Sequence, residues 1–320
     1  MKEELKVLNK NEKVQANESG LGIALASENS HSSFSTLRSS FTKSTLGGGR
    51  KTNNMKKLMI AASAAFCAAV GFADITSANI VGYNTVTLKP GWNMLAVNFK
   101  NVANDDGIDI NDLFPGGGKT DTKFTAGASQ TAADYIQVWD ATGGKYTTYL
   151  LFKPSKGSST AAYYWTDLTL KVAEKKFKNG DAFWFYKRGD QDVTASISGE
   201  VSLDAVKEVA IKPGWNMIGS FFPAGWKLND EYYNPTYWQN SGAVAGASQT
   251  AADYVQVWDA TSEKYTTYLL FKPSKGSSTA TYTWTDLTLK TVTTDVLTAG
   301  KGAWYYHRGS GFNLEIKKQF

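Results

Sequence analysis

The chain contains one stretch of sequence twice, and this repeat decides its architecture. Residues 126–171 read AGASQTAADYIQVWDATGGKYTTYLLFKPSKGSSTAAYYWTDLTLK. Residues 245–290 read AGASQTAADYVQVWDATSEKYTTYLLFKPSKGSSTATYTWTDLTLK, with five differences in 46 positions. A repeat spaced by 119 residues is long enough to be a small domain rather than one unit of a solenoid. We therefore predict two tandem modules, residues 74–202 and residues 203–320.

The sequence before the modules predicts export. Residues 55–73 combine a start-like Met-Lys-Lys, 13 uncharged and mostly apolar residues, and the small-residue exit Gly71-Phe72-Ala73. This order is typical of a secretory signal peptide, and the apolar run is shorter than the ~20 residues that a transmembrane helix needs. We therefore expect cleavage before Asp74 and no transmembrane helix. Residues 1–54 are rich in Ser, Asn, Lys and Glu, and we interpret them as a non-native extension upstream of a start at Met55, or as a disordered leader.

Charge and cysteine content exclude several classes of function. Residues 1–73 carry ten Lys/Arg and five Asp/Glu, so residues 74–320 hold 24 basic and 24 acidic side chains. A neutral mature chain disfavours nucleic acid as a partner. The only cysteine is Cys67, inside the predicted signal peptide, so the modules have no disulfide and no thiol chemistry.

Composition and periodicity indicate an all-β fold. Short alternating or apolar runs rich in Tyr, Trp, Val and Thr lie between clusters of Gly, Pro, Asn and Asp. Lys89-Pro90-Gly91-Trp92 is a candidate type II turn, repeated at Lys212–Trp215. We predict that each module is a small antiparallel β-sandwich or open barrel. The expected strands of module 1 are 80–88, 92–99, 135–139, 146–152, 163–170, 182–186 and 193–201.

Three motifs resemble a group of secreted bacterial β-repeat proteins. They are the ANIVGYNTVTL strand at Ala78–Leu88, the PGWNM turn at Pro90–Met94, and the G-x-x-F-W strand at Gly180–Trp184. The resemblance covers nearly all of residues 74–320 and implies secretion and a β fold. It implies no established activity.

Catalytic and metal-binding patterns are weak. His307 is the one histidine in residues 74–320, and its counterpart is Lys187, so we expect an exposed residue at a strand end rather than a general base. Asp134 and Asp140 recur in module 2 and are explained by turn and capping roles. The acidic run 104–109 lacks the further oxygen ligands of a calcium loop. We predict no enzyme, no cofactor and no metal site.

Aromatic residues are the strongest candidates for binding. Core packing is the first explanation for the tryptophans that recur in both modules. The alternative is a sugar-stacking surface on or beside the repeated hairpin, at Tyr149 and Trp165 and at their copies Tyr268 and Trp284. The wider aromatic set around these four is Tyr146, Tyr163, Tyr265 and Tyr282.

The sequence thus predicts a secreted, non-enzymatic structural or adhesive protein of the cell envelope or extracellular space. One alternative is a carbohydrate-binding protein with two equivalent aromatic sites, whose partner is a surface glycan. Another is an outer-membrane β-barrel, suggested by the terminal Phe320 with Ile316, Leu314 and Phe312 at even spacings before it. Envelope proteins are the remaining candidate partners.

Overall fold

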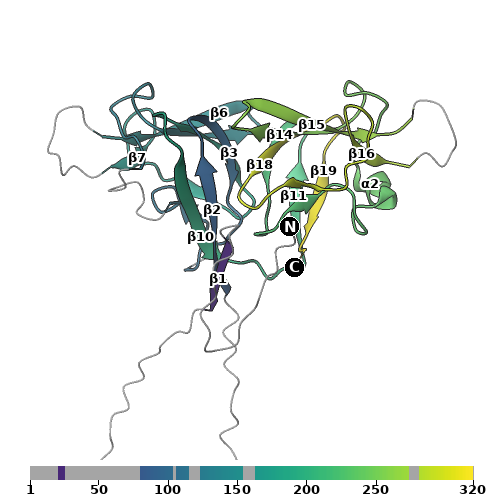
Figure 1. The fold of residues 1–320 in the computed structure, drawn as a ribbon, viewed down its shortest axis with the longest axis horizontal. Helices are drawn as coiled ribbons and strands as arrows, with labels where there is room; N and C mark the ends of the chain where they lie inside the picture. Colours follow the sequence, from purple (N-terminus) through teal and green to yellow (C-terminus); the bar gives the residue numbers. More distant parts are fainter. Residues whose placement is uncertain are drawn as a thin grey trace, which may run out of the picture. The chain divides into compact units, whose positions relative to one another are not determined.

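The structure is a computed structural model that describes residues 80–103, 106–114, 123–153, 163–273 and 281–319, together with the backbone of residues 21–25. These residues belong to one compact unit (Figure 1). The predicted signal peptide 55–73 and the acidic positions 104 and 105 lie outside the described residues. Within the predicted leader, β1 (Leu21–Leu25) pairs antiparallel with β2 of module 1.

The two modules contain the same nine strands in the same order within the described residues, and the chain is all-β as predicted apart from one short helix. In module 1 the strands are β2 (Ile80–Leu88), β3 (Gly91–Ala96), β4 (Ile108–Asp109), β5 (Tyr135–Asp140), β6 (Lys145–Phe152), β7 (Tyr164–Thr166), β8 (Lys176–Phe177), β9 (Ala182–Lys187) and β10 (Val193–Glu200). In module 2 they are β11 (Val206–Ile211), β12 (Gly214–Gly219), β13 (Trp226–Lys227), β14 (Tyr254–Asp259), β15 (Lys264–Phe271), β16 (Thr283–Asp286), β17 (Asp295–Leu297), β18 (Gly302–His307) and β19 (Phe312–Lys317).

Each module is built from one large open sheet and two smaller sheets. The large sheets have the strand orders β3-β9-β5-β6-β7 and β12-β18-β14-β15-β16, and neighbouring strands are antiparallel. A second layer is formed by β2 with β10 in module 1 and by β11 with β19 in module 2. The short two-stranded sheets β4–β8 and β13–β17 are the remaining sheets of module 1 and module 2. This sandwich-like architecture follows the sequence prediction.

The turn that joins the first two strands of each module explains the repeated KPGWNM motif. Gly91 and Gly214 have φ values of 83° and 82°, a left-handed conformation that a type II turn requires and that glycine adopts without steric cost. Asn93 closes the turn, because its side-chain oxygen accepts from the Lys89 amide at 2.8 Å and its side-chain nitrogen donates to the Lys89 carbonyl at 2.8 Å. Asn216 makes the same pair of bonds with Lys212.

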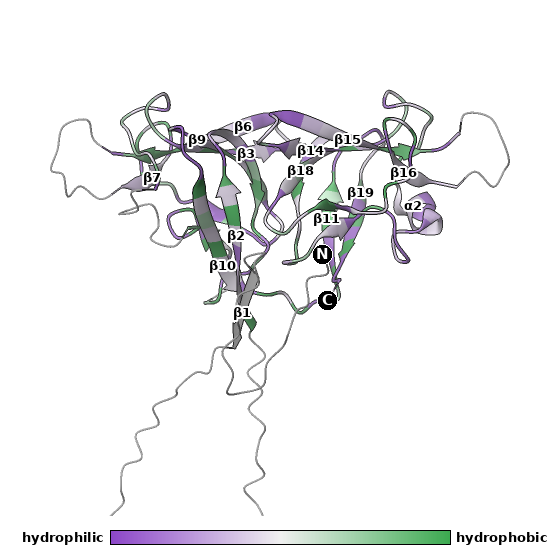
Figure 2. Cartoon of the chain, in the orientation of Figure 1, coloured by the Kyte–Doolittle hydropathy of each residue, from purple (hydrophilic) through white to green (hydrophobic). Residues whose placement is uncertain are grey.

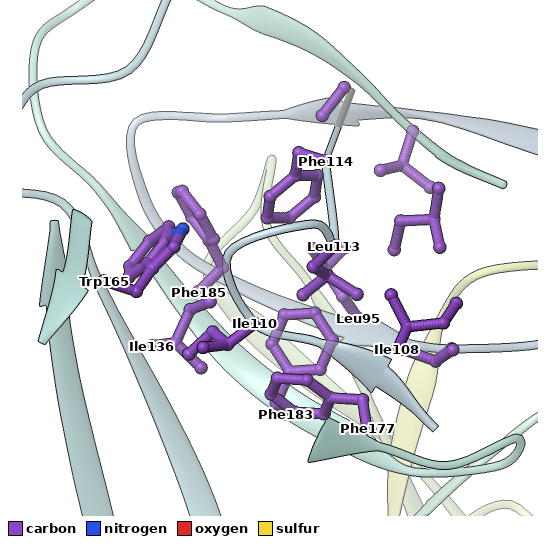
Figure 3. Packing of buried hydrophobic residues seen from close by; sticks show 14 of the residues in the cluster. Leu95, Ile108, Ile110, Leu113, Phe114, Ile136, Trp165, Phe177, Phe183 and Phe185 are labelled. Carbon is purple, nitrogen blue, oxygen red and sulfur yellow. The ribbon is translucent and has the colours of Figure 1, made fainter. Parts of the chain in front are cut away.

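The core of each module lies between its large sheet and its second layer. In module 1, Figure 3 shows Phe183 and Phe185 of β9 packed with Ile136 of β5, Phe177 of β8 and Trp165 of β7. Burial of such apolar side chains is the main source of stability, at ~25 cal/mol per Å² of apolar surface. Module 2 has the corresponding cluster, which includes Tyr305 and Trp284.

Module 2 adds a helix to this plan. The helix α2 (Pro235–Ser241) begins at the N-cap Asn234, whose side-chain oxygen accepts from the Tyr237 amide at 3.0 Å, and it ends at Gly242 in a left-handed conformation. Trp238 is fully buried, and its indole nitrogen donates to the Leu228 carbonyl at 3.0 Å.

Two predicted strands are shorter in the structure: the strand expected over 92–99 is β3, which ends at Ala96, and the other follows Tyr163. We expected a strand over 163–170, but β7 ends at Thr166. Asp167 ends it, because its Oδ1 accepts from the Thr169 amide at 2.7 Å and from the Lys171 amide at 3.1 Å. The short acceptor side chain offers the backbone a turn in place of a ladder.

Candidate functional site

The repeated hairpin β5–β6 separates its aromatic residues onto two faces. Trp139 lies opposite Tyr146 and Gln137 opposite Thr148, so these four side chains share one face of the large sheet. Because side chains alternate along a strand, the Tyr149 side chain lies on the other face, which points toward the module core. The hairpin β14–β15 repeats the arrangement with Trp258, Gln256, Tyr265 and Thr267.

The face that carries Trp139 and Tyr146 points away from the module core, and it holds a row of further aromatic side chains. In module 1, Trp92 makes an edge contact with Trp184 at a centroid distance of 5.6 Å, and Tyr135 stacks on Tyr186 at 4.9 Å. The Arg188 guanidinium lies 4.6 Å from the centroid of the Tyr186 ring, a cation–π contact that fixes the end of this row. Module 2 repeats the row with Trp215, Trp304, Tyr254, Tyr306 and Arg308.

The modules meet along these aromatic faces, and their contacts are reciprocal. The Trp139 indole donates to the Trp215 carbonyl at 2.9 Å, and the Trp258 indole donates to the Trp92 carbonyl at 2.8 Å. Two backbone hydrogen bonds between the modules are reciprocal in the same way. The Ala96 amide donates to the Gly300 carbonyl at 2.9 Å, and the Gly219 amide donates to the Gly180 carbonyl at 3.2 Å. The interface is therefore isologous, as in a twofold dimer, although both halves belong to one chain.

Tyr146 and Tyr265 are the exposed aromatic residues of this junction. Their side chains come from the beginnings of β6 and β15, which meet at the top of the view in Figure 1. Tyr146 packs on Trp139 of its own module at 5.0 Å and near Trp304 of the other at 6.4 Å. Even so, 40% of Tyr146 and 42% of Tyr265 remain accessible.

Burial and neighbouring groups shift the pKa values of both tyrosines at the junction. Burial raises the pKa of Tyr146, a hydrogen bond with Trp184 opposes this rise, and the neighbouring Tyr265 adds to it. Burial likewise raises the pKa of Tyr265, against the effect of its hydrogen bond with Trp304. Both phenols are therefore neutral hydroxyl groups at physiological pH.

The four residues predicted to bind a ligand lie on the core side of the sheets. Trp165 and Trp284 have no accessible surface, and Tyr149 and Tyr268 are half-buried against the module cores. This burial agrees with core packing, the first explanation for the two tryptophans, and does not fit the alternative in which they stack on a sugar. Ligand binding at Tyr149 or Tyr268 stays a prediction. Of the polar loops 153–159 and 272–278, residues 154–159 and 274–278 lie outside the described part of the chain.

A pair of exposed leucine-bearing turns follows β7 and β16. Leu168 and Leu170 are 58% and 47% accessible, and their copies Leu287 and Leu289 are 59% and 50% accessible. Leu170 and Leu289 have φ values of 66° and 67°, a left-handed conformation that costs a leucine roughly 1–2 kcal/mol. No sequence pattern that we recognised predicted this strain.

Asp167 and Asp286 hold these turns in shape. Each carboxylate accepts from the backbone amides two and four residues later and from the threonine hydroxyl of the turn. The threonine hydroxyl makes the largest contribution to lowering the pKa of both carboxyl groups. The strained turns are therefore built from ionised, hydrogen-bonded carboxylates in both modules.

The predicted exposure of His307 is wrong. His307 is 2% accessible, because its ring lies at the buried corner between β18 and the loop before β14. Its Nδ1 lies 2.8 Å from Asp253 Oδ2, and its Nε2 accepts from the Gly311 amide at 3.1 Å. Since the Gly311 amide can only donate, Nε2 is unprotonated and Nδ1–H donates to Asp253. The histidine therefore supports the corner and has no free ring nitrogen for proton transfer.

Among the described residues, no cluster of three or more His, Cys, Asp or Glu side chains is arranged to hold a metal ion. No helix in the described part of the chain is long and apolar enough to cross a membrane. No protein-family model, curated protein or solved structure matches the chain. Function is therefore inferred from the chain's own residues.

Proposed function

We propose that the chain is an exported, non-enzymatic structural or adhesive protein of the cell envelope or extracellular space. The observation that carries this proposal is the pair of exposed, strained leucine turns. Strained backbone persists only where the surrounding structure enforces it, and it is concentrated at functional positions. Here each strained turn keeps two leucine side chains exposed to water, and both modules contain such a turn.

The junction between the modules supports an adhesive role. Its reciprocal tryptophan and backbone hydrogen bonds join the two copies of the turn within one compact unit. Two linked weak contacts on one surface bind more tightly than either alone, because the second contact is intramolecular. The predicted signal peptide 55–73 supplies the route to that surface.

The export step is tested on protein from the native host. Mass spectrometry of the exported protein is expected to find a mature N-terminus at Asp74 or within a few residues of it. Recovery of the full-length chain from the cytoplasm alone would contradict export. Peptides from residues 1–54 in the exported protein would contradict a start at Met55.

The adhesive step is tested by retention on washed native cells and on their isolated envelope. We expect retention to fall when all four turn leucines are replaced (Leu168→Ser, Leu170→Gly, Leu287→Ser and Leu289→Gly). The matched control is Leu203→Ser, because Leu203 is 45% accessible but lies outside the turns. Equal retention of the quadruple variant and the control would overturn the role of the turns.

A further inference from the structure

We propose that one uncharged carbohydrate chain binds across the module junction, at a single composite site whose stacking platforms are Tyr146 and Tyr265. This inference deepens the proposed adhesive function and rests on it. It differs from the sequence prediction in two respects: the site lies on the opposite face of the sheets, and there is one site in each chain instead of two.

The two rings are fixed before any ligand arrives. Tyr146 packs edge-on against Trp139 and Tyr265 against Trp258, both with centroid distances of 5.0 Å. The tryptophans are held in turn by their hydrogen bonds to the other module. A fixed ring loses little conformational entropy on binding, which favours affinity.

The polar groups around the rings suit a carbohydrate. Gln137 donates to the Thr148 hydroxyl at 3.2 Å, and Gln256 donates to Thr267 at 3.2 Å. These residues are partly exposed and lie two positions along the strands from the tyrosines and tryptophans, on the same face. Each pair retains an amide oxygen and a hydroxyl hydrogen with which to bond sugar hydroxyl groups. Figure 2 shows hydrophilic and intermediate ribbon colours where β6 and β15 meet.

The charges at the junction favour an uncharged ligand. Lys145 lies opposite Asp140 at the end of the first hairpin, and Lys264 lies opposite Asp259 in the second. Lys145 also lowers the pKa of Asp140, after the larger effects of the backbone amides of Gly143 and Thr142. Because each lysine faces a carboxylate, these two pairs together carry no net charge with which to attract an acidic or basic polymer.

The site is continuous with the interface between the modules. Tyr146 contacts Trp304 of the other module, so ligand atoms on this ring lie beside residues of both modules. Tyr265 is close enough to Tyr146 to raise its pKa. A linear chain of pyranose rings has apolar CH faces that stack on tyrosine, and the proposed site places one sugar on each of the two rings.

The test is isothermal titration of the mature protein with four neutral hexasaccharides: cellohexaose, xylohexaose, mannohexaose and chitohexaose. We expect at least one to bind with a stoichiometry of one per chain and to change the tryptophan emission, because Trp139 and Trp258 pack on the stacking rings. Binding of two ligands per chain would overturn the composite site. Absence of binding across the four probes would overturn the carbohydrate assignment.

Substitutions then locate the site. Tyr146→Ala and Tyr265→Ala are each expected to weaken binding on the order of tenfold, because stacking on one aromatic ring contributes about that much. Tyr146→Phe keeps the ring and is expected to keep most of the affinity. The matched control is Tyr164→Thr, an exposed tyrosine whose counterpart in module 2 is Thr283. A single alanine variant that retains one full-affinity site would contradict the proposal.

A second measurement covers alanine variants that fail to fold. Hydrogen–deuterium exchange of the unmodified protein is expected to show protection of both β6 and β15 by the bound hexasaccharide, and protection of one hairpin alone would contradict a shared site. If these carbohydrate-binding tests fail, the proposals of export and of retention on cells are still tested by their own experiments. If the protein binds the carbohydrate but is found only in the cytoplasm, the proposed function is contradicted and the carbohydrate site is not.

Discussion

The two modules bury the same aspartate in different surroundings. In module 1, Asp134 accepts from the backbone amides of Arg188 at 2.5 Å and Thr125 at 2.8 Å. In module 2, Asp253 accepts from the corresponding amides of Arg308 and Val244 at 2.8 and 3.0 Å. It also accepts from the Tyr305 hydroxyl at 3.0 Å and from His307.

The difference arises outside the nearly identical block. The counterparts of Tyr305 and His307 are Phe185, which has no hydroxyl group, and Lys187, whose ammonium group donates to the Arg188 carbonyl at 2.7 Å. Burial raises the pKa of Asp134 to about 6, against the lowering effect of its backbone hydrogen bonds. Identical sequence in a repeat therefore does not give identical chemistry, because the strand that faces it has diverged.

The largest expected effect tests whether the extra hydrogen bonds of module 2 matter. Asp253→Ala removes the acceptor of four donors and leaves buried polar groups unpaired, so we expect a loss of about 3–5 kcal/mol in the free energy of unfolding. Asp134→Ala removes the acceptor of two backbone donors and is expected to cost about 1–3 kcal/mol. Chemical denaturation of both variants measures the difference. An equal cost would show that the two corners are energetically equivalent.

The second prediction uses pH to isolate module 1. The pKa of Asp134 is about 6 in the folded chain and 3.8 in the reference state, so the native state holds this proton more tightly. The stabilising contribution is therefore complete below pH ~4 and is lost as pH rises through ~6, with a total of up to about 3 kcal/mol. Denaturation between pH 4 and 7 measures it against Asp134→Asn, in which this component is absent.

Replacing the residues around Asp134 by those around Asp253 tests the same difference between the modules. Phe185→Tyr with Lys187→His gives Asp134 the hydroxyl and imidazole donors that Asp253 has, in exchange for the Lys187 charge, which lowers the pKa of Asp134 less than the backbone hydrogen bonds do. Because donors to a carboxylate favour its charged form, the decline in stability between pH 4 and 6 is expected to shrink. An unchanged pH profile would mean that the backbone, rather than these two side chains, sets the behaviour of the corner.

The third prediction asks whether the two halves of the junction are equivalent. Trp139→Phe and Trp258→Phe each remove one indole hydrogen bond to the other module while retaining an aromatic ring. We expect similar losses of about 1–2 kcal/mol from the lost bond and reduced packing. Thermal denaturation of both variants measures them. A large cost for one and none for the other would contradict the reciprocal interface.

The sequence predicted the architecture because the signals were local and repeated. Alternation along residues 193–201 and the glycine of the KPGWNM turn specify strands and a turn through backbone physics alone. The length of the strand after Tyr163 was overestimated, because the capping effect of the Asp167 side chain competes with strand propensity over a few residues.

The candidate site was harder to predict because it depends on which side of a sheet faces the core. Tyr146 and Tyr149 are three residues apart in one strand, so only one of them can lie on the core face. The sequence placed both in one aromatic set. The reciprocal junction that leaves Tyr146 and Tyr265 exposed brings β6 together with β18, and no local pattern reports such a contact.

The smallest expected effect is a gain in stability at the leucine turns, and it tests whether the modules store equal strain. Leu170→Gly and Leu289→Gly relieve a left-handed leucine, worth roughly 1–2 kcal/mol, while glycine adds ~0.5–1 kcal/mol of unfolded-state entropy. The net expectation is a stabilisation of about 0.5 kcal/mol at each site, additive in the double variant because the turns belong to different modules.

Thermal denaturation checks this gain, with a rise in Tm on the order of 1–2 °C for each substitution. Leu168→Gly is the matched control, because Leu168 is at least as exposed as Leu170 but is not among the residues with positive φ. It gains nothing from glycine's conformational freedom and is expected to lower the Tm. Equal destabilisation by Leu168→Gly and Leu170→Gly would mean that the left-handed leucine is not strained. A rise in Tm accompanied by weaker retention on cells would show that the chain gives up stability to keep these leucines exposed.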